Sequence, residues 1–400
     1  MNKKKLSEIE KDFFWELATN NIQNSIKVFK KIDDMDGLFA YCNKHNIEEH
    51  FHRFLEKNNE NLENNDTFFR FSDLVKKKKI QTLMNIRSGL KLCEEFGKNK
   101  VNYVTLKGLS YIDIIDVDSR LFRDLDILVD IEDIQKSVEI AQKNGFKFKN
   151  NKIFTKELIT KNLDKYCLPQ MYNKDNVVLE IHYRIISNEY TQCKLSSDIL
   201  TKKKLISAYG HQFFVPPNEY KFIHLAYHSI SKGNFDVGVS SIFDLFLFKR
   251  NGMINSDKIN QLAQIYNLSR DIDILNLVLL ESENKLNNLN GQKYLTIVKS
   301  LFLQPVVNKR ITGYHLASGL LGKLSYLIKY LFVGKEILKR DFNFNNSIIL
   351  YLLTPLRWLR QITLKGFSFK DFLLNYNDER RRARNILSLK RASLNKQSYK

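Results

Sequence analysis

Cysteine is scarce in this chain of 400 residues, which contains only Cys42, Cys93, Cys167 and Cys193. No two of them form a Cys-x-x-Cys pair, and none has a histidine at metal-ligand spacing. The sequence therefore offers neither a disulfide framework nor a cysteine-based metal site. Such usage is typical of a reduced, cytosolic protein whose thiols are incidental and buried.

Long apolar runs are also absent. No stretch of about 18 apolar residues appears, so we predict no transmembrane helix. The first residues, MNKKKLSEIEKDFFWEL, are basic but lack the apolar segment of a signal peptide. We therefore expect a cytoplasmic protein.

Proline and glycine are few, at 5 and 15 residues, whereas lysine, asparagine and isoleucine are abundant. Lys and Arg total 64 against 44 Asp and Glu, which gives a net charge of +20. A basic balance favours nucleotides, nucleic acid or an anionic membrane surface as partners, although the compositional bias inflates the lysine count. The apolar fraction of 43% can supply a sizeable core.

Hydrophobic periodicity divides the chain into three parts. Residues 1–98 have helical spacing that ends near Gly97, and residues from about 195 onward have it again. Between them, the spacing predicts strands over 101–108, 122–130 and 176–185, and a helix over 132–146. We therefore predict an α+β chain with an N-terminal helical region (1–98), a mixed core (99–195) and a C-terminal helical region (196–400).

The C-terminal region combines apolar and basic faces. Residues 320–340 and 347–367 are amphipathic, and the tail 378–400 carries many Lys and Arg. One interpretation is a set of core-packing helices with solvated lysines. The other is a basic amphipathic surface that lies peripherally on an anionic membrane.

Two aspartates stand one residue apart inside a strand that its apolar neighbours mark as buried. In a strand, Asp124 and Asp126 point to the same face, while Leu125 and Ile127 point to the other. Two neighbouring carboxylates repel each other, and burying them without a partner is costly. A divalent cation such as Mg²⁺, which takes carboxylate and phosphate oxygens as ligands, removes this conflict.

A third acid has a similar context. Glu180 and His182 share one face of the strand predicted over 176–185. If this strand lies beside the Asp124–Asp126 strand, Glu180 completes a cluster of three carboxylates. Such a cluster can hold two metal ions for in-line phosphoryl or nucleotidyl transfer.

Phosphate-binding residues precede the acids. Lys107 and Gly108 follow a predicted strand, where a glycine lets backbone N–H groups approach a phosphate closely. Arg120 and Arg123 would either neutralise phosphate or form salt bridges with the acids. The alternative for the whole motif is an edge strand with one solvated face.

The residues Leu-Lys-Gly, then Arg, then Asp-Leu-Asp-Ile-Leu-Val resemble the polymerase-β-like nucleotidyltransferase superfamily. The resemblance is closest to its uncharacterised bacterial family with these motifs. It implies a small mixed β-sheet nucleotidyltransferase core with helices packed on it. It also implies that Asp124, Asp126 and Glu180 are catalytic and bind Mg²⁺ or Mn²⁺. Contacts to the NTP would come from Lys107, Gly108, Ser110, Arg120, Arg123, His182 and His228.

The sequence departs from the superfamily pattern at two points. The usual Gly-Ser turn is Lys-Gly-Leu-Ser here, which displaces Ser110, and the third acid is Glu180 where aspartate is commoner. A weaker similarity covers 220–248, where His224 and His228 stand four residues apart before Asp244. We interpret these histidines as core or substrate-pocket residues rather than as a metal pair.

The resemblance implies a two-metal nucleotidyltransferase that uses an NTP. The acceptor is left open among a glycan precursor, a small molecule, a tRNA and a protein, and the family's association with surface polysaccharide production favours the first. One alternative is a non-catalytic protein that binds nucleic acid or nucleotides. Another is a toxin or defence nucleotidyltransferase with the same chemistry.

Overall fold

The structure is a computed structural model that describes residues 6–58, 66–114, 120–148, 167–186, 194–232, 235, 238–282, 289–303, 316, 322–323 and 369–392. The chain divides into two compact units, Met1–Leu286 and Asn287–Lys400. Each unit is described on its own below.

Four short helices open the first unit: α1 (Glu8–Ala18), α2 (Ile22–Phe29), α3 (Met35–His45) and α4 (Glu48–Asn58). Ser7 and Glu10 form a capping box that satisfies backbone N–H groups at the start of α1. The helices enclose an aromatic cluster. The Phe13 ring lies 5.1–5.6 Å from the rings of Phe14, Phe29, Phe51 and Phe54.

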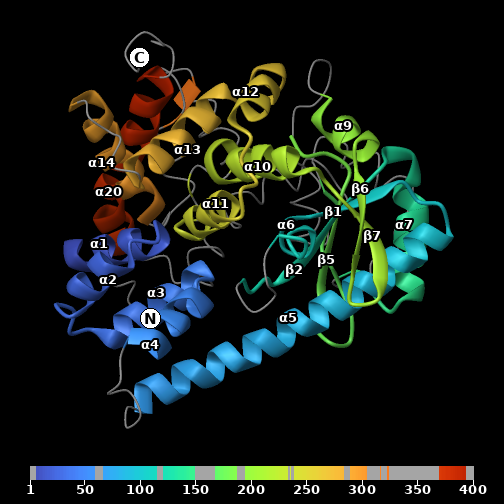
Figure 1. Cartoon of the computed structure of the whole chain (residues 1–400), viewed down its shortest axis with the longest axis horizontal. Coiled ribbons are helices and arrows are strands. Elements are labelled where there is room, and N and C mark those ends of the chain that lie inside the picture. Colours follow the sequence, from blue (N-terminus) through green and yellow to red (C-terminus); the bar gives the residue numbers. More distant parts are fainter. Residues whose placement is uncertain are drawn as a thin grey trace, which may run out of the picture. The chain divides into compact units, whose positions relative to one another are not determined.

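Helix α5 (Asp66–Lys98, 33 residues) leads from these helices to the sheet (Figure 1). Its end differs from the prediction, because Gly97 is still helical. The chain turns at Lys100, whose φ is +54°, and the Val101 N–H donates to the Phe96 carbonyl. This is a Schellman-type ending with a lysine in the left-handed position that glycine usually takes.

The central sheet is mixed, as predicted. Its strands are β1 (Tyr103–Leu106), β2 (Asp124–Val129), β3 (Lys147–Phe148), β4 (Met171–Tyr172) and β5 (Val178–His182), in the order β1-β2-β5-β4-β3. Strands β2 and β5 are parallel, and every other pair is antiparallel. Short helix α6 (Lys107–Ser110) follows β1, and a 3₁₀ turn (Ile131–Asp133) leads into α7 (Ile134–Lys143).

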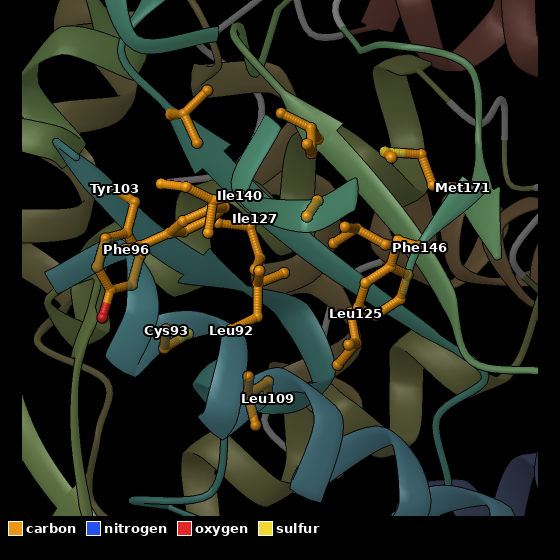
Figure 2. Close-up of a cluster of buried hydrophobic side chains, with 14 of the residues drawn as sticks. Leu92, Cys93, Phe96, Tyr103, Leu109, Leu125, Ile127, Ile140, Phe146 and Met171 are labelled. Atoms are coloured by element: carbon orange, nitrogen blue, oxygen red, sulfur yellow. The ribbon is translucent and has the colours of Figure 1, made fainter. Parts of the chain in front are cut away.

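One face of this sheet packs into a hydrophobic core of the first unit. Leu125 and Ile127 of β2 point into it, as predicted, together with Leu179 and Ile181 of β5. Side chains of α5 and α7 cover this face, and Figure 2 shows Leu92 of α5 and Ile140 of α7 on either side of Ile127. The opposite face of β2 is therefore the one that carries Asp124 and Asp126.

The prediction of continuous helix after residue 195 is wrong for residues 204–215. Helix α9 (Leu195–Thr201) is followed by a hairpin of β6 (Lys204–Ala208) and β7 (His211–Val215). Tyr209 and Gly210 connect the strands, with φ values of +52° and +77°, as a type I′ turn requires. The hairpin lies against β1, where the Thr105 hydroxyl donates to the Phe214 carbonyl.

Helices return after the hairpin. They are α10 (Asn218–Ala226), which continues as a π-helix over Tyr227–Lys232, then α11 (Ser240–Arg250), α12 (Ser256–Ile265) and α13 (Ser269–Ser282). A π-helix is rare in proteins as a whole, and those that occur are frequently found at functional sites.

In the second unit, α14 (Leu289–Leu303) packs against α20 (Phe369–Ala392). Ala383, Ile386 and Leu389 of α20 are buried, whereas Arg380, Arg381 and Arg384 are exposed. The amphipathic segments 320–340 and 347–367 lie almost entirely outside the described residues. Among the helices that are described, none has the length and apolar character needed to cross a membrane.

Candidate active site

The predicted acids meet on the polar face of the sheet. Strands β2 and β5 are hydrogen-bonded in parallel, with Asp126 opposite Glu180 and Leu128 opposite His182. The predicted adjacency of the two strands is therefore found. Because side chains alternate along each strand, Asp126, Glu180 and His182 project from the face opposite the hydrophobic core that contains Leu125 and Ile127.

The side chains of Asp126, Glu180 and His182 form a compact group. His182 Nε2 lies 2.7 Å from Asp126 Oδ1 and 3.5 Å from Glu180 Oε2. One ligand atom from each of the three residues lies within 4.8 Å of the others. Two carboxylate oxygens and an imidazole nitrogen form a donor set that suits a divalent cation such as Mn²⁺, and carboxylates also suit Mg²⁺. The residues present therefore fit the metal that the acids predict.

Asp124 does not belong to this group of three, although it shares their face. It is the first residue of β2 and only partly buried, whereas Asp126 is 2% exposed. His182 joins the two acids, and its predicted contact with the nucleotide stays a prediction. Gln170 holds the other oxygen of Glu180, with Nε2 donating to Oε1 over 2.6 Å.

Lys107 reaches the acids from the turn after β1. Its Nζ donates to Asp126 Oδ1 over 2.8 Å. The register explains this contact, because Leu106 pairs with Asp126 and the chain turns immediately afterwards at Lys107, where φ is +43°. Lys107 was predicted to hold phosphate, and in this structure its ammonium group faces a carboxylate.

The charges of the site are set by these contacts. Burial opposes the ionisation of Asp126, but the Lys107 ammonium and the His182 hydrogen bond hold its pKa well below the usual range. The His182 hydrogen bond likewise lowers the pKa of Glu180. For Asp124, burial and then the charge of Asp126 raise the pKa to about 6. At neutral pH the face therefore carries ionised carboxylates and the charged lysine.

The turn that follows β1 is tightly packed. A Cβ atom on Gly108 would lie 2.4 Å from Cγ of Phe122, so only glycine fits there without a shift. The hydroxyl of Ser110 is buried and donates to the Lys107 carbonyl over 2.8 Å. Ser110 thus stabilises the turn, and its contact with phosphate stays a prediction.

The two arginines point to different neighbours. Arg120 forms a bidentate pair with buried Asp244 of α11, at 2.5 Å and 2.9 Å. Arg123 donates to the Asn43 carbonyl over 2.9 Å and lies 3.6 Å from Glu48, both in the N-terminal helices. Within the described residues, neither arginine forms an ion pair with Asp124 or Asp126. Their contact with phosphate stays a prediction.

A second layer comes from α10 and the π-helix. His224, His228 and Lys232 follow one another at four-residue spacing, and the rings of the two histidines are 6.1 Å apart. Burial, together with the charge of Lys107, lowers the pKa of both histidines, and it lowers the pKa of Lys232 to about 8. Asp126 acts on all three pKa values in the opposite direction. This layer therefore lies close to the acids.

Lys232 was missed by the sequence analysis, and Asp244 was noticed only as part of a helical pattern. The spacing of His224, His228 and Lys232 was a usable signal for Lys232, because residues four apart share a helix face. No signal in the sequence linked Asp244 to Arg120, since 124 residues separate them.

Comparison with known proteins bears on this arrangement. A family model described as "Uncharacterised nucleotidyltransferase" matches residues 32–278, more than half of the chain. The matched segment contains every side chain described in this site. No curated protein matches the sequence.

Proposed function

Because this chain belongs to the uncharacterised nucleotidyltransferase family, we propose that it moves a nucleoside monophosphate from an NTP to an acceptor hydroxyl with Mg²⁺ or Mn²⁺. The acceptor hydroxyl would release its proton to water and form a bond to the α-phosphorus, the bond from the α-phosphorus to the oxygen of the β-phosphate would break, and pyrophosphate would leave. The observation that carries the proposal is the group of Asp126, Glu180 and His182 on adjacent parallel strands.

The acids would hold the metal. Asp126 and Glu180 supply ionised oxygens at the group of three, and Asp124 supplies a further carboxylate on the same face. A bound divalent ion would neutralise part of the charge of the triphosphate and would lower the pKa of the acceptor hydroxyl. His182 would join the acids as a metal ligand through Nε2, which contacts Asp126 in this structure, and Gln170 orients Glu180.

The cations of the site would hold the triphosphate. Lys107 already lies beside Asp126, and the partly buried Lys232 adds a second ammonium group. Charged hydrogen bonds to phosphate oxygens are strong in such a partly desolvated site. Gly108 is packed against Phe122, and its backbone N–H is the group that would approach a phosphate closely.

The acceptor we propose is a hydroxyl of a surface-polysaccharide precursor. The support is the motif pattern of the family together with the exposed Arg380, Arg381 and Arg384 of α20, which suit an anionic membrane surface. Charge reversal of Arg380 and Arg384 would then weaken binding to phosphatidylglycerol liposomes. Unchanged binding would remove the membrane part of the proposal.

The test is transfer of label from each α-³²P-labelled NTP in the presence of Mg²⁺ or Mn²⁺. Soluble, RNA and membrane fractions of a lysate would supply acceptors. Glu180→Gln removes one charge from a partly exposed position, and Asp257→Asn on the exposed face of α12 is the matched control. We expect label in one fraction with the wild type and the control, and at least a hundredfold less with Glu180→Gln.

Equal labelling by Glu180→Gln would contradict the proposed role of the acids. Metal-independent binding of NTP without any labelled product would instead support a non-catalytic nucleotide-binding protein. Label in the RNA fraction, with arrest of growth on expression, would support a toxin or defence enzyme.

A further inference from the structure

A partly open cavity of about 670 Å³ lies in the first unit. It is lined by the end of α1, one side of α4 and one side of α11. This volume is in the range of sites that bind small molecules. None of the side chains described in the candidate active site lines it.

The cavity is strongly basic. Arg53, Lys57, Lys249 and Arg250 line it, and no aspartate or glutamate does. The charge of Arg53 is balanced by buried Glu49, whose Oε1 is 2.7 Å from Arg53 Nε. Lys57 and Arg250 are exposed, and no ion pair among the described residues includes either of them. The cavity therefore has a net positive charge that an anion can neutralise.

One wall of the cavity is aromatic. The His50 ring stacks on Phe243 with centroids 4.1 Å apart and planes 12° from parallel. Burial, followed by the charges of Arg120, Arg53 and Arg250, lowers the pKa of His50 to about 3. The ring is thus neutral at physiological pH. Phe246 extends this wall, and Lys249 Nζ lies 5.6 Å from its ring centroid.

We propose that this cavity is a second binding site, for a phosphorylated molecule that also carries an aromatic or apolar group. The phosphate would lie against Lys57 and Arg250, and the flat group against the aromatic wall. The site is separate from the NTP site, and its existence does not depend on catalysis. It lies close to that site, because α11 also carries Asp244, the partner of Arg120.

The test measures binding of 1-naphthyl phosphate to the full chain by isothermal titration calorimetry, without divalent metal. Lys57→Glu/Arg250→Glu reverses two charges of the cavity. Arg87→Glu/Lys91→Glu makes the same change on the exposed face of α5 and is the matched control. We expect saturable binding to the wild type, at least about tenfold weaker binding to the cavity variant, and less than a twofold change in the control.

A second variant tests the aromatic wall without a change in charge. Phe246→Ala should weaken binding of 1-naphthyl phosphate and leave the weaker binding of inorganic phosphate unchanged. The proposal is overturned by no saturable binding to the wild type, or by equal losses in the two charge-reversal variants. Loss of binding in Lys232→Ala but not in Lys57→Glu/Arg250→Glu would also overturn it, because the probe would then occupy the active site.

Discussion

Few side chains neutralise the negative charge of the acidic face, which is the face of the sheet that carries Asp124, Asp126 and Glu180. Asp126 has two neighbours that favour its ionised form, Lys107 and His182, at 2.8 Å and 2.7 Å. The sequence predicted the acids and the lysine, because alternation along a strand and the position of a turn are local properties. It did not predict that His182 would contact Asp126, since that contact depends on the register between β2 and β5.

Lys232 provides the first test at this scale. Its pKa of about 8 means that its charge, and with it the attraction for a triphosphate, is lost as the pH rises through about 8. We expect Lys232→Ala to raise KM for the NTP about tenfold at pH 7, with a smaller change in kcat. The wild-type KM should rise between pH 7 and 9, and the variant KM should not.

The control is Lys136→Ala, at an exposed position of α7. A variant of Lys232 with an unchanged KM, or with the same rise between pH 7 and 9 as the wild type, would exclude this lysine from the phosphate site.

His45 provides a test of stability. Burial lowers its pKa from 6.5 to about 3, so the unfolded chain binds a proton that the folded chain does not between these values. Stability from this group is therefore lost as the pH falls below about 6.5. The variant His45→Phe is designed to keep the ring contact with Tyr41. When the pH falls from 7.5 to 5.0, we expect the unfolding free energy of this variant to decrease by about 2 kcal/mol less than that of the wild type. Urea denaturation at the two pH values measures this, and parallel losses would refute it.

At the scale of elements, the sheet was predictable and the hairpin was not. Strands β1, β2 and β5 follow from short β-branched runs with apolar alternation, and α7 follows from its apolar spacing and the glycine after it. Strands β3 and β4 contain two residues each, too few to establish a period. The β6–β7 hairpin was missed because β6, which precedes the Tyr209–Gly210 turn, consists of largely exposed residues such as Leu205 and shows no alternation of buried and exposed side chains.

The Arg120–Asp244 pair connects the segment before β2 to α11. Asp244→Ala leaves the partly buried Arg120 guanidinium without its counter-ion, so it should lower the unfolding free energy by about 3 kcal/mol. Arg120→Met/Asp244→Ala removes both charges and should be less destabilised than Asp244→Ala. Urea denaturation of the double-mutant cycle measures the coupling. Additive losses would show that the two side chains do not stabilise each other.

Two glycines of α5 form a matched pair. A Cβ on Gly89 would lie 2.8 Å from Leu109 Cδ2 and 2.9 Å from Leu125 Cδ2, whereas a Cβ on Gly97 would have no atom within 4 Å. We expect Gly97→Ala to stabilise the protein by up to about 1 kcal/mol. Gly89→Ala must displace core leucines and should be about 1–3 kcal/mol less stable than Gly97→Ala. Equal unfolding free energies would show that the core accommodates the methyl group.

At the scale of the whole molecule, the candidate active site and the basic cavity belong to one unit. The acidic face, the histidine layer and the basic cavity all lie within Met1–Leu286, as does the family match to residues 32–278. The three-part division proposed from periodicity, at residues 98 and 195, remains a proposal. Periodicity detects changes in secondary structure, whereas a compact unit is defined by contacts between residues that are distant in the sequence.

A fragment of residues 1–286 tests this organisation. Because the contacts of the first unit are internal to it, we expect the fragment to unfold in one cooperative thermal transition and to keep the metal-dependent transfer of the full chain. Circular dichroism and the label-transfer assay measure the two properties. A fragment without a cooperative transition would show that residues 287–400 are needed for folding.

The position of Lys107 also bears on how the protein is made. Pairing β2 with β5 brings together carboxylates that are 54 residues apart in the chain, and their mutual repulsion opposes that step. Strand β1, the neighbour of β2 on its other edge, delivers the Lys107 ammonium to Asp126. The sheet thus carries its own counter-ion, and we expect the chain to fold without a divalent metal.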